Sequence, residues 1–229
     1  MKIKNFIVTT LALIAIITVN TVNAQDNWQV LFDGTDLSQW RNYQQNQVSD
    51  GWAINNGELT LVKKGAGDIM TKQQYDNFEL SLEWKISAAG NSGVFYHVVE
   101  NDELPQVYYS GLEMQILDNH GRSEPPLEQA GALFALYSPV ADFTKPVGEF
   151  NVARIIVDGD YIEHWLNGHK VVDYQRNSKD FNQQLHESKF ATWPVFAKSS
   201  LGHIALQDHG DEVAFRNIKI RRITQNKSK

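Results

Sequence analysis

The sequence contains no cysteine among its 229 residues. Disulfides, thiolate metal sites, cysteine nucleophiles and a lipidated cysteine are therefore excluded. Long hydrophobic runs are also missing after the first 24 residues, so no later segment is predicted to insert into a membrane. Charged residues make up 21% of the chain and hydrophobic residues 42%, which excludes a disordered or collagen-like protein and predicts a packed core.

The first 24 residues have the pattern of a secretory signal peptide. Lys2 and Lys4 form a basic start, an apolar run follows over residues 6–19, and Val22-Asn23-Ala24 is a small-residue cleavage site. We expect cleavage after Ala24 and export to the periplasm or the extracellular space. Because no cysteine follows the cleavage site, the exported protein is not expected to be a lipoprotein.

Positive charge is scarce in the expected mature chain, residues 25–229. Without Lys2 and Lys4, 19 basic residues face 27 acidic ones, a net charge of −8. Nucleic acid is therefore not an expected partner. No low-complexity segment, repeat or change of composition divides residues 25–229, which predicts a single domain.

Short segments with the periodicity of strands, separated by turn residues, cover most of this chain. In Phe78–Ile86, apolar and polar side chains alternate as in a strand with one buried face. One helix is predicted, from Ser178 as N-cap to about Lys189. Further strands are predicted at residues 51–54, 93–98, 111–117, 152–157, 161–166, 170–174, 202–207 and 213–222. We predict an all-β fold of two packed antiparallel sheets, a sandwich or jelly roll, with at most one short helix.

One predicted strand, residues 111–117, carries side chains suited to chemistry. Glu113 and Gln115 share one face of it, and Met114 and Ile116 share the other. If the apolar pair faces the core, the carboxylate and the amide face outward, either to solvent or to a binding site. Asp118 follows at the strand end, where turn residues are more common than catalysts.

Two histidines are candidates for acid–base work. His209 follows a strand, and histidine is the natural general acid or base near neutral pH. The alternative is a turn in which Asp208 caps backbone amides and Gly210 adopts a positive φ. His164 lies on the strand face opposite Trp165, and a lone histidine on a strand is more often packed or at the surface than catalytic.

Several segments together resemble a known family in their order and residues: LFDGTDLSQW (31–40), GW (51–52) with GEL (57–59), NSGVFY (91–96), GLEMQILD (111–118), GEFN (148–151), HWLNG (164–168) and LQDHG (206–210). The resemblance is to the 3-keto-disaccharide hydrolase family, formerly a domain of unknown function, and spans almost the whole mature chain. It implies a concanavalin-like jelly roll and the cleavage of glycosides oxidised at sugar C3. Two departures are that Phe150 stands where Trp is frequent and His97 where Arg is frequent.

The implied chemistry assigns roles to residues. A ketone at C3 makes the C2 proton acidic, so a base can form an enediolate from which the group on C1 leaves, and water can then add. Such a site needs a base, a donor for the enediolate oxygen and an acid for the departing oxygen. The catalytic candidates are Glu113, His164 and His209. The candidates for substrate binding are Gln115, Asp118, Tyr137, Asn151, Trp165 and Gln207.

The metal requirement and two other functions stay open. A divalent ion held by Glu, Asp and His could stabilise the enediolate, although no ligand spacing defines a metal site or another cofactor. A carbohydrate-binding module would explain the aromatic residues without any catalyst. A conventional jelly-roll glycosidase would need two carboxylates about 5 Å apart. The alternate neighbour of Glu113 is the amide Gln115, so that reading would need a carboxylate from another strand, such as Glu83.

Overall fold

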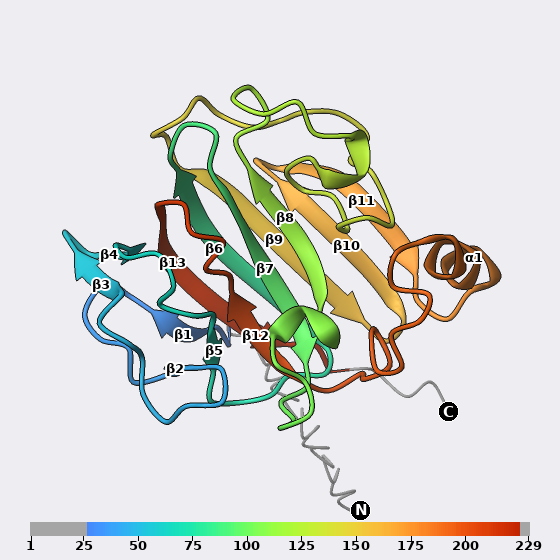
Figure 1. Ribbon diagram of the computed structural model, residues 1–229, viewed down its shortest axis with the longest axis horizontal. Helices are drawn as coiled ribbons and strands as arrows, with labels where there is room; N and C mark the ends of the chain where they lie inside the picture. The colour runs from blue at the N-terminus through green and yellow to red at the C-terminus, as the bar shows by residue number, and fades with distance from the viewer. Residues whose placement is uncertain (1–26, 225–229) are drawn as a thin grey trace, which may run out of the picture.

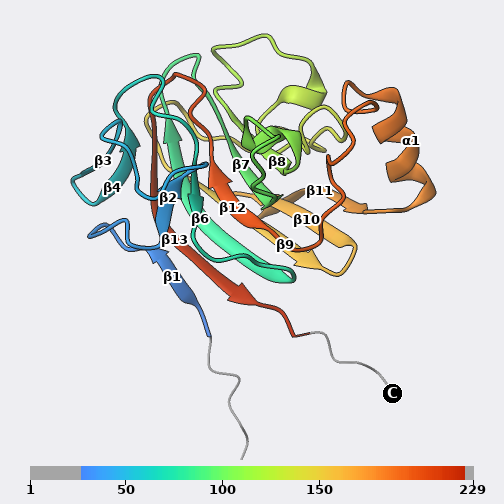
Figure 2. The ribbon, with the colours of Figure 1, turned by 60° about the horizontal axis from the view of Figure 1, so that its bottom comes forward.

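The computed structural model describes residues 27–224, which form two antiparallel β-sheets and one α-helix (Figures 1 and 2). The eight-stranded sheet has the order β11-β10-β9-β6-β13-β4-β3, and β1 pairs with β13. The five-stranded sheet has the order β2-β5-β12-β7-β8. The predicted all-β sandwich with one short helix is therefore confirmed.

Long strands form the middle of the eight-stranded sheet, and shorter ones its ends. Its strands are β1 (Gln29–Phe32), β3 (Trp52–Asn55), β4 (Glu58–Leu61), β6 (Phe78–Ile86), β9 (Asn151–Asp158), β10 (Tyr161–Leu166), β11 (His169–Gln175) and β13 (Val213–Arg222). The five-stranded sheet contains β2 (Trp40–Asn42), β5 (Ile69–Thr71), β7 (Asn91–Val98), β8 (Leu112–Leu117) and β12 (His203–Leu206). Two 3₁₀ turns, η1 (Val107–Tyr109) and η2 (Pro126–Glu128), flank β8 in the sequence.

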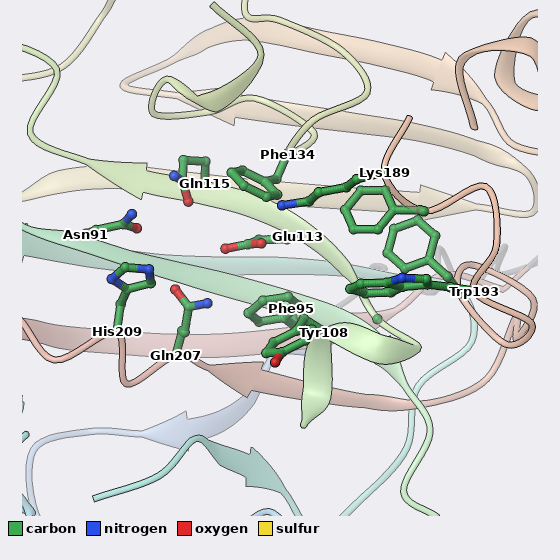
Figure 3. Close-up of a pocket in the computed structure, with 13 residues that line it drawn as sticks. Asn91, Phe95, Tyr108, Glu113, Gln115, Phe134, Lys189, Trp193, Gln207 and His209 are labelled. Carbon is green, nitrogen blue, oxygen red and sulfur yellow. The ribbon is translucent and has the colours of Figure 1, made fainter. Parts of the chain in front are cut away.

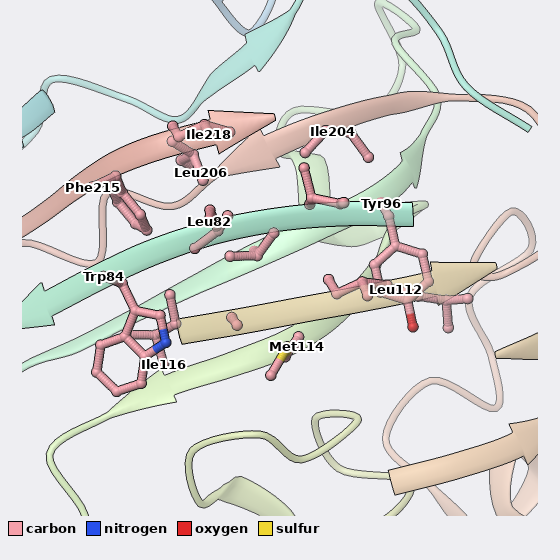
Figure 4. Close-up of a cluster of buried hydrophobic side chains, with 14 of the residues drawn as sticks. Leu82, Trp84, Tyr96, Leu112, Met114, Ile116, Ile204, Leu206, Phe215 and Ile218 are labelled. Atoms are coloured by element: carbon pink, nitrogen blue, oxygen red, sulfur yellow. The ribbon is translucent and has the colours of Figure 1, made fainter. Parts of the chain in front are cut away.

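The core lies between the two sheets. From the larger sheet, β6 buries Leu82 and Trp84, and from the smaller one β8 buries Met114 and Ile116 in the same cluster (Figure 4). Because side chains alternate along a strand, the residues between them point to the outer faces of the sandwich. The outer face of β8 therefore carries Glu113.

The helix α1 (Lys179–Glu187) lies at one end of the sandwich beside β11 (Figures 1 and 2). Ser178 caps it as predicted, because its hydroxyl accepts a hydrogen bond from the backbone N–H of Phe181 at 3.0 Å. The chain after α1 returns across the outer face of the smaller sheet. Among the described residues, no helix is both long and apolar enough to span a bilayer. The predicted signal peptide lies outside the described residues.

Candidate functional site

The outer face of β8 is covered rather than solvated. The segment after η2 runs along its edge: the backbone N–H of Gln115 donates to the carbonyl of Ala132 at 3.1 Å, and that of Phe134 donates to the carbonyl of Glu113 at 3.0 Å. All six residues of β8 are buried. Glu113 and Gln115 therefore line a pocket instead of facing open water.

This pocket has a volume of about 250 Å³ (Figure 3). Strands β7 and β8 form its floor, and its walls come from η1, from the segment before Tyr137, from the chain after α1 and from the end of β12. Its polar and charged lining is Asn91, Glu113, Gln115, Lys189, Gln207 and His209. Its aromatic lining is Phe95, Tyr108, Phe134, Phe190, Trp193 and Phe196.

Glu113 is the carboxylate of this lining and is only 8% exposed. Burial raises its pKa to about 8, the charges of Asp68 and Glu128 add to the increase, and the nearby Lys189 ammonium opposes it. At neutral pH the group is therefore mostly a protonated carboxylic acid. A carboxyl that keeps its proton at pH 7 can donate it to a reacting oxygen.

A glycine in the neighbouring strand makes room for this carboxyl group. A Cβ built on Gly93 of β7 would lie 2.2 Å from Oε1 of Glu113. Every other residue would push the carboxyl aside, so the glycine allows a close approach that a side chain would prevent.

Three buried amide oxygens of the pocket have no hydrogen-bond partner within residues 27–224. They are Oδ1 of Asn91, Oε1 of Gln115 and Oε1 of Gln207. The amide nitrogen of Gln115 is used, because it donates to the carbonyl of Glu128 at 3.2 Å. An unpaired buried acceptor costs about 1 to 3 kcal/mol, and each of these oxygens belongs to an amide side chain that lines the pocket.

His209 reaches the pocket from a tight turn. The carboxylate of Asp208 accepts hydrogen bonds from the backbone N–H groups of Gly210 and Gly67, both at 2.9 Å, and Gly210 has a φ of +95°. The turn interpretation of this segment is therefore confirmed. The same turn directs the exposed imidazole of His209 toward the polar end of the pocket (Figure 3).

Lys189, which the sequence placed only at the predicted end of a helix, extends over the pocket near Glu113 (Figure 3). Its Nζ atom lies 4.1 Å from the ring centroid of Phe134 and 5.3 Å from that of Phe190. Within the described part of the chain, the ammonium makes no hydrogen bond or ion pair. A cation held by aromatic rings is available to a negative charge that develops in the pocket.

The structure does not bring His164 to this pocket. Its side chain is fully buried between the sheets, where Nε2 lies 2.9 Å from the hydroxyl of Tyr96 and Nδ1 lies 3.1 Å from the carbonyl of Gly131. Burial lowers its pKa to about 4, so the ring is neutral at physiological pH. Its surroundings are those of a packed core histidine, the alternative that its strand pattern had left open.

Two more predicted site residues lie at strand ends, Asp118 after β8 and Asn151 at the start of β9. Asp118 accepts hydrogen bonds from the backbone N–H groups of Ala89 at 2.8 Å and His120 at 3.1 Å. Burial opposes its ionisation, but these hydrogen bonds outweigh that effect and lower its pKa. Asn151 joins loop segments, since its Oδ1 accepts from the backbone N–H of Lys145 and the amide of Asn167, both at 2.8 Å.

The two predicted ring contacts also lie elsewhere. Tyr137 stacks on Tyr174 and donates a 2.5 Å hydrogen bond to Asp180. Trp165 lies on the outer face of the eight-stranded sheet, where its Nε1 donates to Glu163 at 2.7 Å. Of the predicted residues, the pocket therefore brings together Glu113, His209, Gln115 and Gln207.

The outer face of the larger sheet also holds Glu83, which pairs with Arg216 at 2.7 Å. The second carboxylate of a conventional glycosidase is thus not supplied to the pocket by Glu83. Within residues 27–224, no group of three or more histidine, aspartate or glutamate side chains is arranged to hold a metal ion.

The sequence interpretation missed the aromatic lining. Val107–Tyr109 and residues 190–196 are rich in aromatic side chains, but they lie in irregular segments without a period. A local concentration of Tyr, Trp and Phe outside strands was the signal available, since large rings in loops often form binding surfaces.

Comparisons with known proteins agree with this architecture. A 3-keto-disaccharide hydrolase from Bacteroides thetaiotaomicron is 33% identical over 86% of this chain and 78% of its own length. A crystal structure of a candidate glycosyl hydrolase from Parabacteroides distasonis superposes with a TM-score of 0.79 at 30% identity, covering 86% of this chain and 94% of that one. A Bacillus subtilis protein with a galectin-like fold gives a TM-score of 0.53 at 10% identity, over 86% of this chain and 89% of that one, which shows a likeness of fold alone.

The sequence profile of the 3-keto-alpha-glucoside-1,2-lyase-like domain matches residues 27–221, almost the whole of the described chain. Together with the 33% identity to a 3-keto-disaccharide hydrolase, this match shows that the chain belongs to the 3-keto-alpha-glucoside-1,2-lyase-like family.

Proposed function

We propose that the pocket cleaves glycosides whose sugar ring carries a ketone at C3. The observation that carries the proposal is Glu113, a buried carboxyl whose raised pKa keeps its proton at neutral pH, facing the same pocket as the imidazole of His209. A proton donor and a proton acceptor at one cavity are the pair that elimination at C1 and C2 requires. Family membership supports the choice of a 3-keto-glycoside as substrate.

Amide side chains line the end of the pocket that we assign to the keto-sugar. Asn91, Gln115 and Gln207 line this end with amide groups, which can donate hydrogen bonds to the hydroxyl groups of a sugar ring and accept them. The keto-sugar therefore occupies the end of the pocket nearest His209.

In the reaction, His209 takes the proton from C2. The electron pair of the C2–H bond moves toward C3, and the C3 oxygen becomes negatively charged. Lys189 supplies positive charge for this oxygen, as preorganised charge does in other enolate-forming sites. When the C3 carbonyl forms again, a double bond forms between C1 and C2 and the C1–oxygen bond breaks. Glu113 donates its proton to the departing oxygen, and addition of water across the double bond gives the hydrolysis product.

The test compares matched glucosides with and without the C3 ketone. We expect turnover of the keto compound alone, with enzyme-dependent deuterium at C2 when the reaction runs in heavy water and a control without enzyme is subtracted. Turnover of the unoxidised glucoside would contradict the proposal and favour a conventional glycosidase. Binding of either sugar without any turnover would favour a carbohydrate-binding module.

Variants test the assigned roles. Glu113→Gln and His209→Ala should each lower kcat by a hundredfold or more, the scale of a lost general acid or base. Glu83→Gln is the matched control for the first, because Glu83 lies on the outer face of the other sheet. His186→Ala is the control for the second, because His186 is an exposed histidine of α1 that is not part of the pocket lining. Undiminished rates in both site variants would mean that these residues are structural.

We also propose that the protein is exported. The basic start, apolar run and small-residue site of the first 24 residues support this, and cleavage should leave Gln25 as the first residue. N-terminal sequencing of the exported protein is the test. Recovery of the chain with Met1 from the cytoplasm alone would contradict it.

A further inference from the structure

The two ends of the pocket have different chemistry. Figure 3 shows Asn91, Gln207 and His209 at one end and Trp193 at the other, with Glu113 between them. The first end, which we call the amide end, is lined by amide side chains, whereas the opposite end is built mainly of rings. If the keto-sugar occupies the amide end, the group that leaves from C1 occupies the aromatic end.

Trp193 is the centre of the aromatic end. Its ring stacks on Tyr109 at a centroid distance of 4.9 Å and an angle of 30°, and it lies 5.8 Å from Tyr108 at 38°. Phe190 meets the Trp193 ring edge to face at 5.0 Å, and Phe196 stacks on Phe190 at 3.9 Å. These rings form a wall of flat faces and edges against which another ring can pack.

We propose that this site prefers 3-keto-glycosides whose leaving group is a flat apolar ring, such as an aryl or arylmethyl alcohol, over those with a second sugar. The inference rests on the proposed function and adds the class of leaving group to it. A second sugar could pack the C–H groups of one ring face on these rings, but its hydroxyl groups would meet few polar partners at this end, where unpaired polar groups are costly. An aromatic ring would instead gain stacking and apolar burial.

The size of the pocket agrees with a small glycoside. Its volume of about 250 Å³ lies just below the range of about 300 to 1,000 Å³ typical of small-molecule sites. One sugar ring and one aromatic ring fit this scale better than an oligosaccharide does. Glu113 and Lys189 stand between the two ends, where the bond between sugar and leaving group would lie.

The experiment separates ring recognition from leaving-group acidity. We would measure kcat/KM for the benzyl and methyl 3-keto-glucosides of the same anomer, because both release alcohols of similar acidity. A 3-keto-disaccharide of that anomer completes the set. The benzyl compound is expected to exceed the methyl compound by at least about tenfold, the scale expected from burying one aromatic ring, and also to exceed the disaccharide.

Matched variants test whether the preference for the benzyl compound depends on the aromatic wall. Trp193→Leu and Tyr108→Leu should each lower the benzyl-to-methyl ratio about fivefold or more, because the benzyl group gains from these rings and the methyl group does not. Tyr161→Leu is the control, because Tyr161 is as exposed as Tyr108, at 37% against 36%, but belongs to β10 of the other sheet. The ratio should be unchanged in this control.

The outcomes distinguish the two proposals. Turnover of all three compounds with a benzyl-to-methyl ratio near one, or with the disaccharide preferred, would overturn the leaving-group inference and leave 3-keto-glycoside cleavage standing. A benzyl preference that survives both wall substitutions would also overturn it. Failure to cleave any of the three compounds in correctly folded protein would instead overturn the proposed function.

Discussion

Replacing Glu113 with glutamine should remove turnover and at the same time stabilise the protein at neutral pH. The substitution keeps the shape of the side chain and removes its ionisation. In the unfolded chain this carboxyl ionises with an ordinary pKa of 4.5, whereas burial in the pocket wall raises its pKa to about 8 in the folded protein. Folding at pH 7 must therefore hold a proton on a group that would otherwise lose it.

The size of this effect follows from the two pKa values. A difference of one pKa unit corresponds to about 1.4 kcal/mol, so the interval from 4.5 to about 8 is worth roughly 5 kcal/mol. Between these values the folded protein binds more protons than the unfolded chain, so the free energy of unfolding falls as pH rises. At pH 7 the accumulated cost is roughly 3 kcal/mol, which the uncharged glutamine avoids.

The assay is urea unfolding of both proteins at about pH 4, pH 7 and pH 9. The variant should match the wild type near pH 4 to within about 1 kcal/mol, exceed it by roughly 3 kcal/mol near pH 7, and by more above pH 8. Asp68, whose pKa burial raises to about 6, titrates in both proteins, so the difference between them contains Glu113 and its coupling to Asp68 but not the separate titration of Asp68. A difference that stays constant across this range would refute a raised pKa at Glu113.

Three further substitutions test the site and the core. Gly93→Ala would place a Cβ 2.2 Å from the Glu113 carboxyl in the present geometry, so kcat/KM should fall at least a hundredfold while the thermal melt by circular dichroism shifts little; undiminished activity would show that the carboxyl can move aside. Lys189→Met removes the charge that lowers the pKa of Glu113, so the alkaline limb of the kcat/KM profile should move to higher pH, and an unmoved limb would contradict this coupling. His164→Ala opens a cavity in the core and removes one of the two hydrogen-bond partners of the Tyr96 hydroxyl, the other being the hydroxyl of Tyr174, and urea unfolding should show a loss of about 3 kcal/mol. An unchanged stability with a hundredfold loss of kcat would mean instead that His164 is catalytic.

The longer strands could be predicted because a single local signal defines them. Strands β6, β10 and β13 have the bounds that alternation indicates, and β7, β8, β9, β11 and β12 differ from the predicted ends by one or two residues. Strand β12, which has four residues, was predicted, whereas β1, β2 and β5, which contain three or four residues each, were not. These strands form through pairing with sequence-distant partners, such as Trp40 with Thr71, which no local pattern contains.

The candidate site also shows what local alternation can predict and what only the packing of distant segments decides. Alternation along β8 places Glu113 on the face opposite Met114, and the outward direction of Glu113 follows once Met114 is found packed in the core. His164 also alternates with its neighbours, but its face is the buried one because Leu166 on the same side packs in the core. A pattern gives two faces, and only the packing of the second sheet decides which of them is the outer one.

The division between strands and loops gives the pocket two kinds of support. Glu113, Gln115 and Phe95 stand on paired strands of the smaller sheet, so their positions are fixed by its hydrogen bonds. Trp193 stands on an irregular segment, and half of its support comes from other rings of that segment. A substitution in the aromatic wall therefore alters the shape offered to a leaving group without disturbing the strand that holds the acid. In this arrangement the position of the acid Glu113 depends on the sheet and the preference among leaving groups depends on the aromatic segment, which makes these two properties separable by mutation.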